Sequence, residues 1–298
     1  MDTRLNKLII DTDLGDDIDD MWAIGFAALA GFDIRLITVC YADIEYKLKC
    51  AQYMKDALKL ECAIAGGVEK ARTHTPHAQR VKNVKCDVSP LAAEDAIAEA
   101  VGKNAFTDIA AIGPMTNVGA FVKKYPALKD RCRIVCMGGS VYKGIYGVDR
   151  AHAEYNLKSD RDASAAVLES GFTVVYAPLD VNRDFIIDGA RYRRLRTAKN
   201  PVTQKLLALY DEWQLNYHGY SIKFDSAVST AIQYDTTPLL YILDKTLYDM
   251  DCGRYGIDRA GKLGKTDNGH EACVLLGIDR EKALDAALDI FMREGYEH

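Results

Sequence analysis

The sequence predicts an α/β protein with a mainly parallel open sheet and helices on both of its faces. Short apolar runs that are typical of buried strands alternate five or six times with segments of helical periodicity. Several of these runs end in Asp, Gly or Asn residues, so polar side chains gather at one edge of the expected sheet. Ligands bind beyond the carboxyl ends of the strands in such sheets, and we expect the active site there.

The first strand and the first helix flank an acidic loop. Residues 8–10 read as a buried strand and residues 23–29 as a buried helix, and six carboxylates lie between them: Asp11, Asp13, Asp16, Asp17, Asp19 and Asp20. Helix capping in water would explain one or two of these, but six repel one another more than a helix N-terminus can offset. A hard cation with oxygen ligands is the expected completion. An EF-hand loop starting at Asp11 is excluded, because its sixth and twelfth positions are Asp16 and Trp22.

The remaining elements follow from apolar runs, Gly and Pro punctuation and helical periodicity. Strands are expected at residues 34–39, 62–65, 108–112, 133–137 and 172–177, and helices at 44–60, 90–101, 160–170, 201–210, 225–234 and 281–294. Thr116 or Asn117 can cap a further helix, and residues 68–89 and 140–154 read as loops. Because no repeat, low-complexity run or linker interrupts the chain, we expect one domain over residues 1–298.

Composition narrows the partners and the compartment. A net charge of −5 and a pI near 5.7 argue against a nucleic-acid or anionic-membrane surface. No apolar run reaches membrane-spanning length, and the opening residues lack the apolar region of a signal peptide. The eight cysteines form no C-x-x-C pair, and Cys40, Cys62, Cys136 and Cys273 lie in apolar runs. We therefore expect buried, reduced thiols and a cytoplasmic protein.

Several motifs together resemble one enzyme family. The opening Asp-Thr-Asp-Leu-Gly with its following Asp-Asp precedes Gly-Pro-Met-Thr-Asn (113–117), Met-Gly-Gly (137–139), Ala-Glu-Tyr-Asn (153–156) and Asp225 before an apolar segment. In these motifs and their order, nearly the whole chain resembles the calcium-dependent nucleoside hydrolases, the inosine-uridine preferring N-ribohydrolase family. The resemblance implies hydrolysis of ribonucleosides to ribose and free base with Ca²⁺, in a homodimer or homotetramer.

The resemblance also implies a role for each motif residue. Asp13 would bridge the cation and the attacking water as general base. Asp20, Asp225 and the backbone carbonyl of Ile112 would be further cation ligands. The sugar hydroxyls would be held by Asp19, Asn156 and Glu154, and Asp43 occupies the neighbourhood of another expected sugar-contacting residue. Asp11 would support the site from behind.

Two departures from the family pattern leave alternatives open. The glycine is normally followed by one residue and then the acidic pair, so that Asp16-Asp17 could be the pair in place of Asp19-Asp20, with Asp17 as a ligand. We align on Asp19-Asp20 because the apolar helix follows them directly. The residue before the late aspartate is a leaving-group-protonating His in well-known members, whereas Phe224 stands before Asp225 here.

Aromatic and histidine residues allow both a functional and a packing interpretation. A base could stack on the side chains of the segment YDEWQLNYHGY, and one of them could supply the missing acid: Tyr210, Trp213, Tyr217, His218 and Tyr220. Packing of an amphipathic helix explains them equally well. His152 fits a surface histidine, and His74 and His77 lack metal-ligand spacing.

Two other function classes are compatible with parts of the pattern. A haloacid-dehalogenase-like phosphohydrolase would use Asp11 as nucleophile and Asp13 as acid/base, but Gly15 and the aspartates up to Asp20 do not fit it. A calcium-dependent ribose- or nucleoside-binding protein with weakened catalysis is the second alternative, and Phe224 favours it.

Overall fold

The computed structural model describes residues 7–145, 148–217 and 224–294. Its nine-stranded sheet has the order β3-β2-β1-β4-β5-β6-β9-β7-β8. The strands are β1 (Lys7–Thr12), β2 (Asp33–Ala42), β3 (Ala63–Ala71), β4 (Thr107–Ala111), β5 (Cys132–Met137), β6 (Thr173–Ala177), β7 (Tyr248–Ile257), β8 (Leu263–Lys265) and β9 (His270–Ile278). β1 to β6 and β9 run parallel, whereas β7 pairs antiparallel with β8 and β9. The predicted mainly parallel α/β fold is confirmed.

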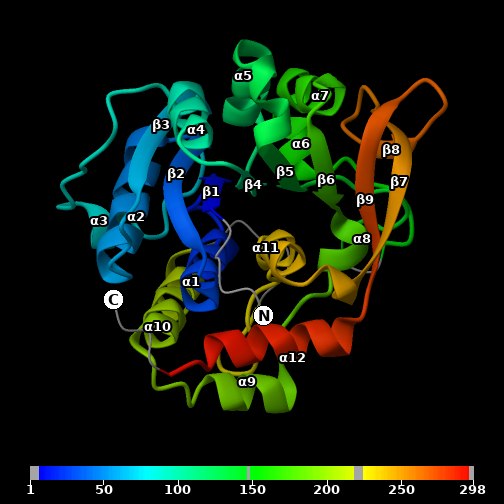
Figure 1. Cartoon of the computed structure of the whole chain (residues 1–298). Helices are drawn as coiled ribbons and strands as arrows, with labels where there is room; N and C mark the ends of the chain where they lie inside the picture. The colour runs from blue at the N-terminus through cyan, green and yellow to red at the C-terminus, as the bar shows by residue number, and fades with distance from the viewer. Residues whose placement is uncertain (1–6, 146–147, 218–223, 295–298) are drawn as a thin grey trace.

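Helices cover both faces of the sheet (Figure 1). α4 (Ala93–Gly102), α5 (Thr116–Lys124) and α7 (Arg161–Glu169) lie on one side, and α1 (Asp19–Ala30), α9 (Gly189–Leu195), α10 (Pro201–Asn216), α11 (Thr236–Leu243) and α12 (Arg280–Phe291) lie on the other. α2 (Ile44–Ala57) contributes to the core on the α1 side. The remaining short helices are α3 (Ala78–Val81), α6 (Tyr155–Ser159), α8 (Leu179–Asn182) and two 3₁₀ turns, η1 (Pro126–Arg131) and η2 (Lys245–Leu247).

Successive strand residues pack on opposite faces, as the twofold periodicity of a strand requires. In β1, Leu8 and Ile10 face the core under α1, whereas Ile9 faces the core under α4 and α5. Burial on both faces explains why these strands are continuous apolar runs and carry no polar alternation. Polar residues are thereby left to the strand ends, where the site is formed.

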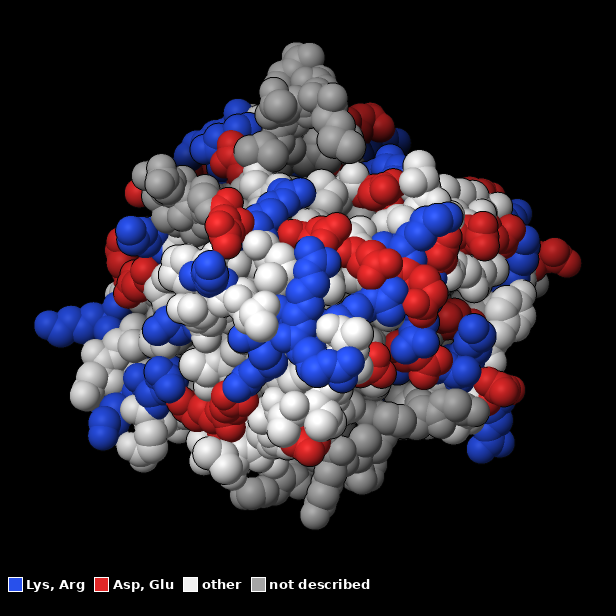
Figure 2. Space-filling view, turned by 90° about the horizontal axis from the view of Figure 1, so that it is seen from below, with Lys and Arg blue, Asp and Glu red and all other residues white. Residues whose placement is uncertain are grey.

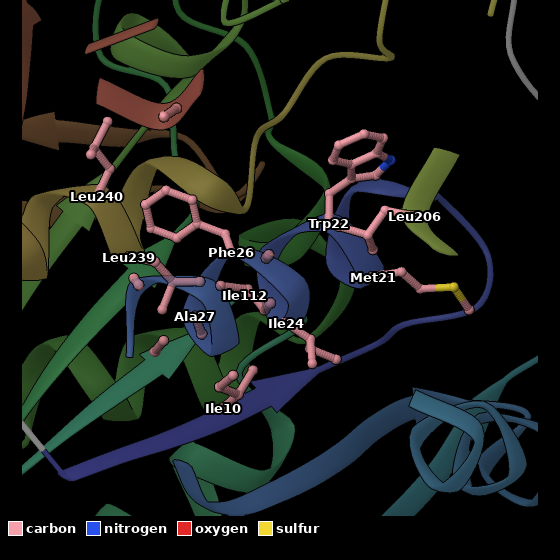
Figure 3. Packing of buried hydrophobic residues seen from close by; sticks show 14 of the residues in the cluster. Ile10, Met21, Trp22, Ile24, Phe26, Ala27, Ile112, Leu206, Leu239 and Leu240 are labelled. Carbon is pink, nitrogen blue, oxygen red and sulfur yellow. The ribbon is translucent and has the colours of Figure 1, made fainter. Parts of the chain in front are cut away.

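Helix α1 is the centre of the larger core. All twelve of its residues are buried, and Figure 3 shows Trp22 and Phe26 among side chains from β1, α10 and α11. Phe291 of α12 packs edge-on against both rings, with centroid distances of 5.1 and 5.7 Å. Because Asp19 and Asp20 occupy its first turn, the packing of this helix fixes two acidic side chains of the site.

Two expectations about the carboxyl-terminal third are wrong. Residues 225–234 form no helix; a turn lies there, and the helix starts at Thr236. Residues 248–278, for which we expected no strand, contain β7, β8 and β9. Their pairing is antiparallel and brings together residues that short-range periodicity does not connect.

The expectation that the thiols are all reduced is also corrected. Cys252 and Cys273 form a disulfide, since they lie directly opposite each other in β7 and β9 with their Cα atoms 4.1 Å apart. Cys40, Cys62 and Cys136 are buried free thiols as expected, and Cys86 is an exposed one. The 21-residue separation of the paired cysteines gave no signal in the sequence.

The face seen in Figure 2 carries positive and negative side chains side by side. Ion pairs join α9 to α12: Arg191 binds Glu281 and Asp285, and Arg194 binds Asp289. Exposed pairs of this kind contribute little to stability. Among the described residues, no helix combines the length and the apolar character needed to cross a bilayer.

Candidate active site

The loop between β1 and α1 forms the floor of a cavity of about 340 Å³. Five of its aspartates line this cavity: Asp13, Asp16, Asp17, Asp19 and Asp20. The end of β4 approaches the loop closely, because the Ile112 N–H donates to the Asp11 carbonyl at 2.8 Å. A Cβ atom on the next residue, Gly113, would lie 2.8 Å from the Asp13 carboxylate, so only glycine fits at this approach.

A third element brings a further carboxylate to the acidic floor. Asp235 directly precedes α11, which packs against α1. Carboxylate oxygens of Asp19, Asp20 and Asp235 all lie within 4.8 Å of one another, and the three residues are buried. Asp13 lies beside them in the same cavity, and its charge acts on all three. This is the oxygen-rich arrangement that a hard divalent cation requires.

A carboxylate and an amide at the start of α6 also line the cavity. Glu154 caps this helix: its carboxylate accepts backbone N–H bonds from Gly139, Asn156 and Leu157 at 3.1, 2.8 and 3.1 Å. The Asn156 side-chain amide donates to the carbonyls of Ile112 and Met137 at 3.0 and 3.2 Å. Glu154 and Asn156 are both buried and both line the cavity.

Burial makes the carboxylates of the floor costly to ionise. Desolvation raises the pKa of Asp13 to about 6 and the pKa of Asp19 to about 7. Burial, together with the neighbouring carboxylates, raises the pKa of Asp20 and of Asp235 well above the ordinary range. The charge of a bound cation would offset this penalty and favour the ionised forms. The donor set therefore fits a hard divalent cation.

Asp11 lies behind the cavity and does not line it. Its Oδ1 accepts hydrogen bonds from the Thr38 hydroxyl and the Asn117 amide at 2.5 and 2.8 Å, and the side chain is fully buried. Among the described residues, no group donates to its Oδ2. Desolvation raises the pKa of Asp11 to about 7. This burial is incompatible with a nucleophile that must reach a phosphoryl group in the cavity.

Comparison with known proteins decides the family. The model of the inosine-uridine preferring nucleoside hydrolase family matches residues 8–285. The chain belongs to this family.

Curated relatives of this nucleoside hydrolase family member include two pyrimidine-specific ribonucleoside hydrolases. RihA of Shigella boydii serotype 4 (strain Sb227) is 30% identical over 192 residues, which cover 61% of this chain and 60% of that protein. RihA of Citrobacter koseri (strain ATCC BAA-895 / CDC 4225-83 / SGSC4696) is 30% identical over 188 residues, 59% and 58% of the two chains. The chain thus spans about 60% of the length of the curated relatives that it matches.

Solved nucleoside hydrolase structures share the fold along nearly the whole chain. The plant nucleoside hydrolase PpNRh1 superposes with a TM-score of 0.81 at 17% identity, covering 97% of this chain and 99% of that one. The purine-preferring ribonucleoside hydrolase from Gardnerella vaginalis gives 0.77 at 24% identity, covering 96% and 98%. At these identities the likeness concerns the fold alone.

Asp225, which the resemblance implied as a cation ligand, lies away from the cavity. Asp225 is exposed in a turn, where its Oδ1 accepts the Ala227 N–H at 2.9 Å, and it does not line the cavity. Asp235, ten residues later, lies in the acidic group. The sequence signal was present, since Asp235 also precedes an apolar helix. The residue before it is Tyr234, which lines the cavity, whereas Phe224 does not.

Asp43 also lies elsewhere than expected. It does not line the cavity: its carboxylate accepts hydrogen bonds from the Arg72 guanidinium at 2.7 Å and from the Thr73 N–H at 2.6 Å. These bonds and the Arg72 charge outweigh burial and lower the pKa of Asp43. The φ angle of +43° at Asp43 turns the chain sharply between β2 and α2. The expectation that Asp43 contacts the sugar is therefore not carried forward.

The geometry favours one of the two alternative acidic pairs. Asp19 and Asp20 converge with Asp235, whereas the Asp16 carboxylate accepts a hydrogen bond from the Thr73 hydroxyl at the rim. Asp17 lines the cavity as well. We therefore keep Asp19 and Asp20 as the pair in the proposal below.

Of the aromatic residues singled out in the sequence, Tyr217 lines the cavity and stacks on Trp213 at 4.7 Å. The Trp213 indole donates to the Asp16 carbonyl at 2.8 Å, and Tyr210 is buried in the core. His218 and Tyr220 lie outside the described residues. His152 is exposed at the cavity rim, and His77, expected in a loop, is fully buried beside Glu212.

The raised pKa values predict the pH dependence of stability without a divalent cation. In the native state Asp13 has a pKa of about 6 and Asp19 a pKa of about 7, above the ordinary value of 3.8. Between about pH 4 and pH 7 the native state therefore holds more protons than the unfolded chain. The stability from these protons is complete below about pH 4 and is lost as the pH rises through 6 to 7. In EDTA, we expect Tm to fall by roughly 5 °C or more between pH 5 and pH 8.

Scanning calorimetry in EDTA and in Ca²⁺ checks this. Saturating calcium should reduce the fall in Tm between pH 5 and pH 8, because an ion that binds the ionised carboxylates stabilises the native state. A Tm that rises with pH in EDTA would contradict the electrostatic account of the floor.

Proposed function

We propose that this chain hydrolyses the N-glycosidic bond of ribonucleosides, releasing ribose and the free base. One observation carries the proposal: the buried carboxylates of Asp13, Asp19, Asp20 and Asp235 line the same cavity as Glu154 and Asn156. Membership in the nucleoside hydrolase family supports the same activity.

The cation that we propose is Ca²⁺, held by Asp13, Asp20, Asp235 and the carbonyl of Ile112. All four residues line the cavity, and calcium takes six to eight oxygen ligands of this type. When bound, such an ion orients vicinal hydroxyls and lowers the pKa of a water. Asp13 is the proposed general base. It lines the cavity and lies in the loop before α1, whereas Asp19 and Asp20 belong to the helix itself.

The ribose is proposed to lie between the floor and α6. Asp19 would accept one sugar hydroxyl, and Asn156 would accept another through its side-chain oxygen, because its amide nitrogen is occupied by two carbonyls. Glu154 accepts three backbone bonds, which leaves about one lone-pair site for the 5′-hydroxyl. As the glycosidic bond breaks, positive charge grows on the sugar, and the surrounding carboxylates stabilise it.

The departing base is proposed to stack on an aromatic ring of the cavity. Tyr155, Tyr217 and Tyr234 line the cavity, and aromatic rings offer a stacking surface to any base. Tyr234 stands where well-known relatives have a histidine, so a phenol replaces the imidazole next to the late aspartate.

The direct test is a nucleoside panel. Purified protein with 1 equivalent or more of Ca²⁺ is incubated with uridine, cytidine, inosine, adenosine and guanosine, and released reducing sugar is measured. We expect release from at least one nucleoside and its loss after treatment with EDTA. Tight nucleoside binding without release would favour the binding-protein alternative, and magnesium-dependent cleavage of an aryl phosphate would favour the phosphohydrolase.

The setting of this activity is proposed from the composition and from the family resemblance. We place the enzyme in the cytoplasm as a homodimer or homotetramer that takes small nucleosides and neither nucleic acid nor membrane. Analytical ultracentrifugation would check the assembly, and a monomer at micromolar concentration would contradict it.

A further inference from the structure

A fully buried lysine lies behind the acidic floor. Lys47 belongs to the first turn of α2, and its side chain has no exposed surface. Its ammonium donates hydrogen bonds to the backbone carbonyl of Asp13 and, at 3.3 Å, to that of Leu14. Lysine is almost never fully buried without a specific partner, so this position calls for an explanation.

The loop that Lys47 contacts is anchored through four consecutive carbonyls. Lys47 holds the first two, the Tyr46 hydroxyl donates to the Gly15 carbonyl at 2.7 Å, and the Trp213 indole donates to the Asp16 carbonyl at 2.8 Å. A loop that leaves a strand has no ladder partners for its carbonyls. Side chains of α2 and α10 supply them, while the aspartates of the loop face the cavity.

Lys47 differs from the other two anchors because it carries a charge. Its positive charge favours the ionised forms of Asp13 and Asp20. The ammonium is bonded to carbonyls, so its charge is not committed to one carboxylate and acts on several of them. At distances of several ångströms inside a protein, such a charge is weakly screened.

We propose that Lys47 is a positioning residue that acts as a built-in counter-charge: it stabilises the acidic loop against the mutual repulsion of its carboxylates while no cation is bound. The inference rests on the proposed function, because it takes the acidic floor to be a cation site. It assigns Lys47 no contact with the substrate. The cation and Lys47 then offset the same negative charge, so each should matter more when the other is missing.

Lys47→Met tests this, because methionine has a similar length and no charge. Lys49→Met is the matched control: Lys49 lies on the same helix, where it pairs with Glu45 at 2.7 Å. In EDTA, we expect Lys47→Met to lower Tm by roughly 5 °C, and saturating Ca²⁺ to reduce this deficit to less than half. Lys49→Met should match the wild type in both conditions.

The same argument predicts the calcium affinity. Removing a positive charge next to the site should strengthen Ca²⁺ binding about fivefold, as measured by titration calorimetry on chelator-treated protein. An anchor that acts through hydrogen bonds alone would give the opposite sign, because the loosened loop would bind calcium more weakly.

The outcomes separate this inference from the proposed function. If the wild type gains stability with calcium but the Lys47→Met deficit is unchanged or larger, the counter-charge role is overturned. If the wild type does not respond to calcium at all, the proposed cation site fails first. If Lys47→Met does not fold, Lys47→Gln is measured in its place, because glutamine keeps a hydrogen-bond donor and loses the charge. Its Tm deficit relative to the wild type must likewise be smaller in Ca²⁺ than in EDTA.

Discussion

Asp13→Asn should lower kcat about a thousandfold while leaving the fold intact. Asparagine has the same shape, but it cannot take a proton from water, and losing a general base costs about two to four orders of magnitude. The backbone of residue 13 stays anchored by Lys47, so no large rearrangement is expected. Steady-state kinetics on the best nucleoside of the panel, with circular dichroism on the same sample, measures both parts.

Asp16→Asn is the control for that experiment. Asp16 belongs to the same loop and lines the same cavity, but its carboxylate is bonded to the Thr73 hydroxyl at the rim. We expect its kcat to stay within about tenfold of the wild type, since it removes no proposed base. An Asp13→Asn enzyme with more than a tenth of wild-type turnover would remove Asp13 from the base role.

Asp235→Asn should weaken Ca²⁺ binding about a hundredfold or more. Asp235 lies within 4.8 Å of Asp19 and Asp20, and replacing a carboxylate by an amide removes one full charge from a buried cation site. Without calcium the same substitution should raise Tm, because it relieves repulsion among buried carboxylates. Titration calorimetry and thermal unfolding in EDTA provide the two measurements.

Asp225→Asn distinguishes the structural assignment from the one based on sequence order. Asp225 is exposed in a turn, so its substitution should leave calcium affinity and turnover within about twofold of the wild type. If Asp225→Asn abolished calcium binding and Asp235→Asn did not, the late ligand would be the residue that the sequence alone suggested.

The parts of the fold that could be predicted from the sequence are those with local signals. The strand at residues 8–10 and the helix at 23–29 are apolar runs bounded by charged loops, and both exist as β1 and α1. Parallel strands gather their carboxyl ends, so Asp13, Ile112 and Met137 could be expected at one edge, and all three line one cavity. The specific roles of these residues stay predictions.

What the sequence did not predict depends on long-range contacts. Asp225 and Asp235 both precede apolar residues, and only the packing of α11 against α1 separates them. In the sequence, Lys47 looks like one more charged residue of an amphipathic helix. Nothing local indicates that the first turn of α2 contacts the loop between β1 and α1. Likewise, the pairing of Cys252 with Cys273 follows from the register of β7 and β9, which is set by the whole sheet.

The complete burial of α1 has a consequence for how substrate preference can change in this protein. A helix whose every residue is packed has little freedom to adjust, so the part of the cavity that it supplies is rigid. Variation is tolerated at the mouth, where Ile145, His152 and Tyr155 are exposed to solvent. Substitutions that change which bases are accepted, in evolution or by design, should therefore occur at the entrance of the cavity and leave α1 unchanged.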